Sequence, residues 1–149
     1  MRYYIGNTPD SIARTKYVLA ALGFLALGAA QADTLSITLQ NITERSGKVM
    51  LSIGGEAAFN DQGEPTAQAI LEPSQDEIVF MVDALPRGEY AVRVMHDVNG
   101  NGKLDTNIAG IPKEPYGFSN NARGNFGPPT FADAKFTING DTAIAITME

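Results

Sequence analysis

Apolar and polar residues alternate along most of the chain after residue 33, which is typical of strands with one face in a core. In residues 34–42, leucine or isoleucine occupies every second position from Leu35 to Leu39, and polar residues lie between them. The same alternation predicts strands at 48–53, 67–71, 77–83, 89–96, 134–138 and 142–148. Turn residues separate these segments, and Asn139-Gly140-Asp141 predicts a tight hairpin between the last two strands. No segment after residue 33 has the periodicity of an amphipathic helix.

About seven short strands with turns between them predict an all-β fold, an immunoglobulin-like or transthyretin-like β-sandwich. A small barrel is the alternative architecture. Because the chain of 149 residues contains no cysteine, no disulfide can hold the domain together, and its apolar core must do so.

The first 32 residues have the features of a cleavable signal sequence. Arg14 and Lys16 precede an apolar run at 17–27, and Ala30-Gln31-Ala32 offers a small-x-small cleavage site. The alternative is a transmembrane anchor, but the run is short for a bilayer and has no charged stop after it. We therefore expect a signal peptide at 1–32, a single domain at 33–149, and a periplasmic or secreted location.

The charge of the domain is strongly acidic. Removing residues 1–32 takes away three basic residues and one acidic residue, which leaves 8 basic and 16 acidic residues and a formal net charge of −8. Nucleic acids and anionic membranes attract basic surfaces. The composition thus argues against both as partners, and we expect no membrane insertion after the signal is removed.

Residues 97–131 form one long connection that lacks the apolar–polar alternation of the predicted strands. Connections of this length are usually functional or disordered. Tyr116, Phe118, Phe126 and Phe131 lie among its glycines and asparagines. These aromatic side chains could form a platform for a ligand. The interpretation we prefer is that they turn inward and pin the connection to the sandwich.

The start of this connection has the pattern of a calcium-binding loop. Oxygen-bearing side chains occupy positions 1, 3, 5 and 9 of that pattern, Gly102 stands at the turning position 6, and Lys103 at position 7 would offer its backbone carbonyl. The predicted metal ligands are Asp97, Asn99, Asn101, Lys103 and Asp105.

Two features depart from the helix-flanked form of such loops. Position 12 is Ile108, which has no carboxylate, and the segment before Asp97 alternates as a strand does. Glu114 could close the ligand shell from further along the chain. The competing interpretation is a glycine-rich turn with solvated carboxylates.

His96 is the only histidine of the chain. Alternation places it on the core face at the end of its strand, where a buried, hydrogen-bonded role is more common than catalysis or metal binding. Ser119 lacks the second glycine of a nucleophile elbow. A hydrolase that uses His96 with Asp97 or Glu114 remains the enzymatic alternative.

The longer motif resembles a known family. The stretches His96–Asp105, Gly110–Glu114 and Tyr116–Asn121, followed by Phe126-Gly127-Pro128-Pro129 and Phe131, are similar to the bacterial family DUF2141. The resemblance covers residues from about Leu35 to Ile146. It implies a small exported protein of Gram-negative-type bacteria, and it implies no activity, because the family is uncharacterised.

The sequence as a whole favours an exported, non-enzymatic binding or structural module of the bacterial envelope. Calcium is its expected cofactor and stabilises the long connection. The expected partner is an unknown envelope protein or a small ligand.

Overall fold

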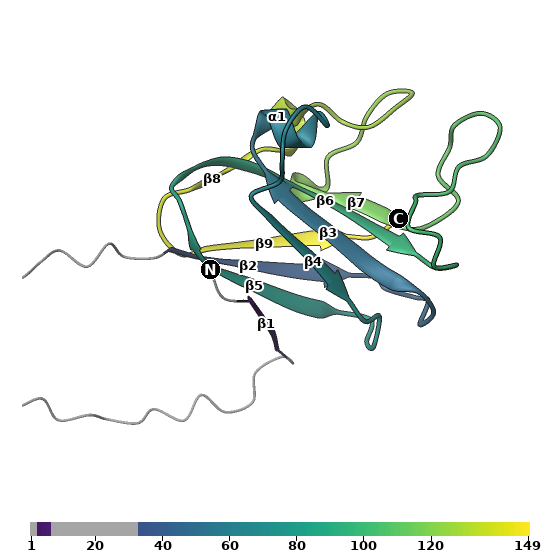
Figure 1. Ribbon diagram of the computed structural model, residues 1–149, viewed down its shortest axis with the longest axis horizontal. Helices are drawn as coiled ribbons and strands as arrows, with labels where there is room; N and C mark the ends of the chain where they lie inside the picture. The colour runs from purple at the N-terminus through teal and green to yellow at the C-terminus, as the bar shows by residue number, and fades with distance from the viewer. Residues whose placement is uncertain (1–2, 7–32) are drawn as a thin grey trace, which may run out of the picture.

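The computed structural model describes the backbone of residues 3–6 and the whole of residues 33–149. Two sheets face each other in it (Figure 1). This confirms the predicted all-β sandwich, whereas its assignment to an immunoglobulin-like or transthyretin-like type stays a prediction. The predicted signal sequence, apart from the backbone of Tyr3–Gly6, lies outside the described residues. No helix in the described part of the chain is long and apolar enough to cross a membrane.

Sheet A has the strand order β1-β5-β2-β9. The β5 strand pairs antiparallel with both β1 and β2, and β2 pairs parallel with β9. The bounds are β1 Tyr3–Gly6, β2 Asp33–Gln40, β5 Ile78–Leu85 and β9 Thr142–Thr147.

Sheet B has the strand order β4-β3-β6-β7, and β8 pairs with the beginning of β6. The strands are β3 Lys48–Gly54, β4 Ala67–Leu71, β6 Gly88–Asp97, β7 Tyr116–Phe118 and β8 Phe136–Ile138. Short helical turns complete the fold: α1 Glu56–Phe59, the 3₁₀ turn Ser119–Asn121 and α2 Phe131–Ala134.

The main core lies between the two sheets, and the alternating apolar residues fill it as predicted. Sheet A contributes Leu35, Ile37, Leu39, Ile78, Phe80, Val82 and Ile146, and sheet B contributes Val49, Leu51, Ile53, Val92 and Val94. A second, smaller cluster joins α1 and α2 to β6 through Phe59, Ala91, Phe131 and Ala134. The segment that follows β7 is therefore fixed at its C-terminal end, where Phe131 and Ala134 of α2 pack into this cluster.

The predicted hairpin at Asn139–Asp141 is wrong. A turn is present there, but β8 pairs with β6 in sheet B and β9 pairs with β2 in sheet A. The polar groups of the turn bind the start of β2: Gly140 N donates to Asp33 Oδ2 at 2.9 Å, and Asp141 Oδ1 accepts from Thr34 N at 3.0 Å. These bonds direct the chain across the sandwich instead of back along the same sheet.

Five of the described elements were not expected from the sequence: β1, α1, β7, the 3₁₀ turn at Ser119–Asn121 and α2. Both α1 and α2 are four residues long, too short for a helical period to be visible. The β7 strand is three residues long and lies inside the long connection. A capping box between Thr130 and Asp133 begins α2, so the strand expected from residue 134 starts only at Phe136.

Asp33 is a buried carboxylate at the start of β2, and it gives the fold a predicted dependence on pH. Arg87 Nε donates to Asp33 Oδ2 at 2.9 Å. The hydrogen bond from Arg87 lowers the pKa of Asp33, with a smaller contribution from Gly140 N, while burial opposes the shift. Because the folded-state pKa lies below that of the unfolded chain, the stabilisation is present above the ordinary aspartate value of about 3.9 and is lost as the pH falls through the folded-state pKa.

We expect Asp33→Asn to lower the free energy of unfolding at pH 7 and to lose less stability than the wild type on acidification. Urea denaturation of both proteins at pH 7 and at about pH 3 measures this. Equal losses on acidification in the two proteins would show that Asp33 does not contribute to the acid sensitivity of the fold.

Candidate functional site

The residues predicted to bind calcium lie at the end of β6, in a segment that we call the acidic loop (residues 97–105). Asp97 is the last residue of β6 and is buried. Its Oδ1 accepts hydrogen bonds from Gly100 N at 2.9 Å and Asn101 N at 3.0 Å, and its Oδ2 accepts from Gly102 N at 2.7 Å. Positive φ angles at Gly100 and Gly102 let the chain wrap around this carboxylate.

The other predicted side chains lie on the same loop and contact one another. Asn99 Nδ2 donates to Asp105 Oδ2 at 2.6 Å, and Asn101 Nδ2 donates to Asp105 Oδ1 at 3.1 Å. Asn101 Oδ1 accepts from Lys103 N at 2.8 Å, and the side chain of Lys103 is exposed. The structure thus brings together all five residues that the sequence singled out.

Glu114 closes the acidic loop from its far side. This carboxylate is 8 % exposed. Its Oε1 accepts from Val98 N at 2.9 Å and its Oε2 accepts from Asp105 N at 2.9 Å, so one side chain ties the two ends of the loop together. Glu114 therefore contacts the loop through backbone N–H groups and acts as its clamp.

The oxygen atoms of the acidic loop are suitable ligands for a hard cation such as calcium, but two side chains would have to rotate before they could bind one. Carboxylate, amide and carbonyl oxygens are the ligands that calcium prefers. The amide nitrogens of Asn99 and Asn101 now face Asp105, so both amides would have to rotate to turn their oxygens towards an ion. No group of three or more histidine, cysteine, aspartate or glutamate residues in the described part of the chain has the geometry to hold a metal. Ile108, at position 12 of the calcium pattern, is fully exposed.

His96 points away from the acidic loop, into the end of the core. It is 1 % exposed, and its Nε2 lies 2.7 Å from the carbonyl oxygen of Ser46, which can only accept, so Nε2 is the donor of this hydrogen bond. Its Nδ1 is buried and has no hydrogen-bond partner among the described residues. Consecutive strand residues point to opposite faces, so the side chains of His96 and Asp97 diverge.

Ser119 and the aromatic residues of the long connection mostly have structural roles. Ser119 is buried, and its hydroxyl accepts from Val92 N at 2.9 Å and donates to the carbonyl of Ala134 at 2.6 Å. Phe118 and Phe131 pack on the ring of Phe59, with centroids 6.0 and 5.9 Å away. Tyr116 and Phe118 are only half-buried and lie on the outer face of sheet B, where Phe118 also contacts Phe59. The preferred inward interpretation is confirmed for Phe131, which is buried. It is wrong for Phe126, which is fully exposed near the tip of a loop, where no core lies beneath it.

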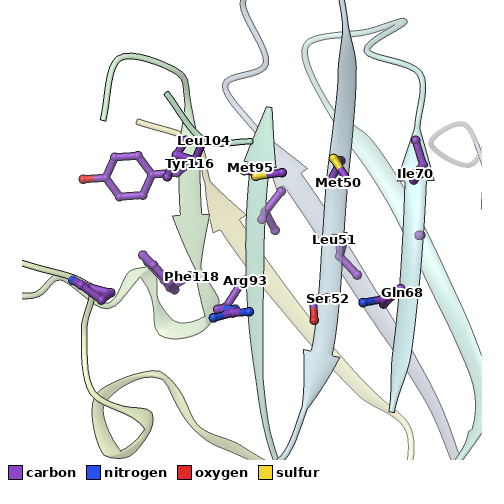
Figure 2. Close-up of a pocket in the computed structure, with 13 residues that line it drawn as sticks. Met50, Leu51, Ser52, Gln68, Ile70, Arg93, Met95, Leu104, Tyr116 and Phe118 are labelled. Carbon is purple, nitrogen blue, oxygen red and sulfur yellow. The ribbon is translucent and has the colours of Figure 1, made fainter. Parts of the chain in front are cut away.

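The connection at 97–131 is divided by β7 into two loops, at 98–115 and 122–130, that project beyond the sheets (Figure 1). Each contributes one wall residue, Leu104 and Pro128, to a hollow on the outer face of sheet B. The floor of this hollow includes Met50, Ile70 and Met95 (Figure 2). Sequence reasoning missed these residues. The sequence did contain an indication of this hollow: alternation places the large apolar side chains of Met50, Ile70 and Met95 on the solvent-facing side of their strands.

Comparison with known proteins places the chain in a family. A family model described as "Uncharacterized protein conserved in bacteria (DUF2141)" matches residues 37–146. No curated protein and no solved structure matches the chain. The matched segment includes the acidic loop, Glu114, β7 and the loop at 122–130, and it covers most of the sandwich. The chain belongs to the uncharacterised bacterial family DUF2141.

Proposed function

We propose that the protein is a non-enzymatic binding or structural module of the bacterial envelope whose acidic loop holds Ca²⁺. The observation that carries this proposal is the arrangement of the acidic loop, in which Asp97, Asn99, Asn101 and Asp105 converge around the turn at Gly102. The wrapped backbone is already held by Asp97 and Glu114. A preorganised loop loses less conformational entropy when it binds an ion.

The carboxylates of the loop retain capacity for a cation. A carboxylate offers about four lone-pair positions, and Asp97 Oδ2 and both oxygens of Asp105 each accept one hydrogen bond. Rotation of the Asn99 and Asn101 amides would add two oxygens, and the Lys103 carbonyl is the fifth ligand. With two carboxylates in this set, we expect a dissociation constant on the order of 10⁻⁴–10⁻³ M, which is typical of extracellular modules.

Thermal melts of residues 33–149 in chelator, in calcium and in matched magnesium test the proposal. At ten times the dissociation constant, calcium should stabilise the wild type by about 1.4 kcal/mol and raise its Tm by several degrees. Magnesium should act weakly, because it requires a tight octahedral shell and keeps its water. Asp105→Asn removes one charge with little change of shape and should abolish the calcium shift.

Asp83→Asn is the matched control. Asp83 is a half-buried aspartate of β5 in sheet A, whereas the acidic loop follows β6 of sheet B. It accepts from Thr34 Oγ1 of the neighbouring strand β2 at 3.1 Å. This variant should keep the full calcium shift. Identical wild-type midpoints in all three buffers, with no heat of calcium binding in calorimetry, would leave the acidic loop as a glycine-rich turn.

We propose export to the periplasm or the medium from the predicted signal sequence. The strand β2 begins at Asp33. Cleavage after Ala32 would therefore remove β1 and its pairing with β5, but would retain β2 and every core residue named above. Intact mass of the exported protein should match a chain that starts at Asp33, and an uncut chain in the membrane fraction would refute the proposal.

The hydrolase alternative is not favoured by any observation on the described residues. The ring of His96 is buried against Ser46, and the carboxylates of Asp97 and Glu114 accept backbone N–H groups. The binding-module proposal is therefore the one we develop below.

A further inference from the structure

The hollow on the outer face of sheet B, which we call the outer groove, has a volume of about 400 Å³. Its floor consists of two rows of side chains that cross the four strands β4, β3, β6 and β7 (Figure 2). Strand pairing fixes the rows: one contains Ile70, Met50, Met95 and Tyr116, and the other contains Gln68, Ser52, Arg93 and Phe118. With strands about 4.8 Å apart, each row is roughly 14 Å long.

The first row is apolar except for the phenolic hydroxyl of Tyr116 at its β7 end. Met50 and Met95 are direct cross-strand partners in the middle of it, and Ile70 at its β4 end is 65 % exposed. Leu104 from the acidic loop borders the same groove. Methionine side chains are flexible and adapt to ligands of irregular shape, so this row suits the apolar body of a small molecule.

The second row places one positive charge in the groove. Arg93 is the only charged residue among those that line it. Its Nη1 donates to the carbonyl of Phe59 at 3.0 Å and its Nη2 donates to Asp61 Oδ1 at 2.6 Å. A guanidinium group has five N–H donors in a planar fork, so these two bonds leave donors for a further acceptor. Ser52 and Gln68 add polar groups to the same row.

We propose that the outer groove binds a small amphipathic carboxylate, with its apolar body across the Met50–Met95 row and its carboxylate on Arg93. Charge favours an anion, because the lining carries one guanidinium and no acidic side chain. Asp61, outside the lining, occupies one N–H donor of this guanidinium, and a bound carboxylate would share the group with it. The volume falls within the range of small-molecule sites, which are mostly apolar with a few placed polar groups. This inference rests on the proposed role as a binding module, and it does not require the calcium ion.

Methionine methyl NMR provides a direct test with octanoate as the probe. The chain from Asp33 onward has four methionines, of which Met50 and Met95 lie in the groove, while Met81 lies on β5 and Met148 is buried. Octanoate should shift the methyl signals of Met50 and Met95 saturably and leave those of Met81 and Met148 in place. Octan-1-ol, which has the same tail and no charge, should bind at least about ten-fold more weakly.

Three variants sharpen the test. Asp61→Asn removes the carboxylate that competes with octanoate for Arg93. Asparagine fits at this position because Asp61 is exposed and has a φ of 58°, a conformation that asparagine tolerates. Octanoate should then bind several-fold more tightly, and the affinity for octan-1-ol should not change. Met50→Glu puts a like charge beside the apolar body and should weaken octanoate at least about ten-fold. Met81→Glu is the same change on the other sheet and should leave octanoate affinity within about two-fold.

Three results would overturn the proposal: no saturable shift at Met50 and Met95, equal affinity for octanoate and octan-1-ol, or equal weakening by Met50→Glu and Met81→Glu. Parallel titrations in calcium and in chelator separate this proposal from that for the acidic loop. Loss of octanoate binding with an intact calcium shift would refute the groove alone. Octanoate binding without any calcium shift would refute the calcium site alone.

Discussion

Replacing Phe80 with alanine should lower the free energy of unfolding by about 3–5 kcal/mol, the usual cost of truncating a buried phenylalanine. Phe80 lies in the middle of β5, faces Ile37 across the strand pair and is 2 % exposed. The variant loses both the burial of the ring and the packing of its neighbours around the resulting cavity. A loss of this size is a large part of the 5–15 kcal/mol that stabilises a typical domain.

Urea denaturation at neutral pH, with the slope of the transition checked against the wild type, measures this loss. Met81→Ala is the control, because Met81 follows Phe80 on the same strand and is only half-buried on the opposite face. It should lose much less stability. A loss below about 1 kcal/mol for Phe80→Ala would contradict the assignment of this face to the core.

Replacing Gly47 with alanine is expected to have the second large effect, of at least about 3 kcal/mol. Gly47 precedes β3, has a φ of 73° and packs against the base of the acidic loop. A Cβ at this position would lie 1.9 Å from the carbonyl oxygen of Asp97 and 2.7 Å from the Cα of Val98. Both of these are backbone atoms, so no side-chain rotation relieves the clash. The variant should therefore displace the acidic loop, and it should also weaken the calcium binding proposed for that loop.

Gly100→Ala separates the clash from the backbone strain. Gly100 has nearly the same φ, 76°, but a Cβ there would meet no atom within 4 Å. This control should show only the cost of a left-handed conformation, about 1–2 kcal/mol. Urea denaturation measures the free energy of unfolding of both variants. Similar decreases for Gly47→Ala and Gly100→Ala would show that the backbone near Asp97 moves to accept the added Cβ without a measurable loss of stability.

The acidic loop and the outer groove are adjacent parts of one surface. Leu104 belongs to the loop and also lines the groove, and Glu114, which clamps the loop, lies two residues before Tyr116 in the floor. The variants Asp105→Asn and Met50→Glu address the two sites separately, because each changes one residue that only one of the sites uses.

The sequence by itself determined the all-β class and most of the strands, because alternation with a period of two directly reflects which side chains a sandwich buries. It also determined the residues of the acidic loop. Asp97, Asn99, Asn101 and Asp105 lie within nine residues, and the bonds that bring them together form inside that short segment. Local sequence could therefore specify the arrangement.

The tertiary structure decided what depends on residues far apart in the chain. The turn at Gly140 does not form a hairpin because its polar groups bind Asp33 and Thr34, more than a hundred positions earlier. The outer groove exists because β4, β3, β6 and β7 align Ile70, Met50, Met95 and Tyr116 in one row. Alternation assigns each of these side chains to a face of its own strand, but only the pairing of strands determines which side chains are neighbours.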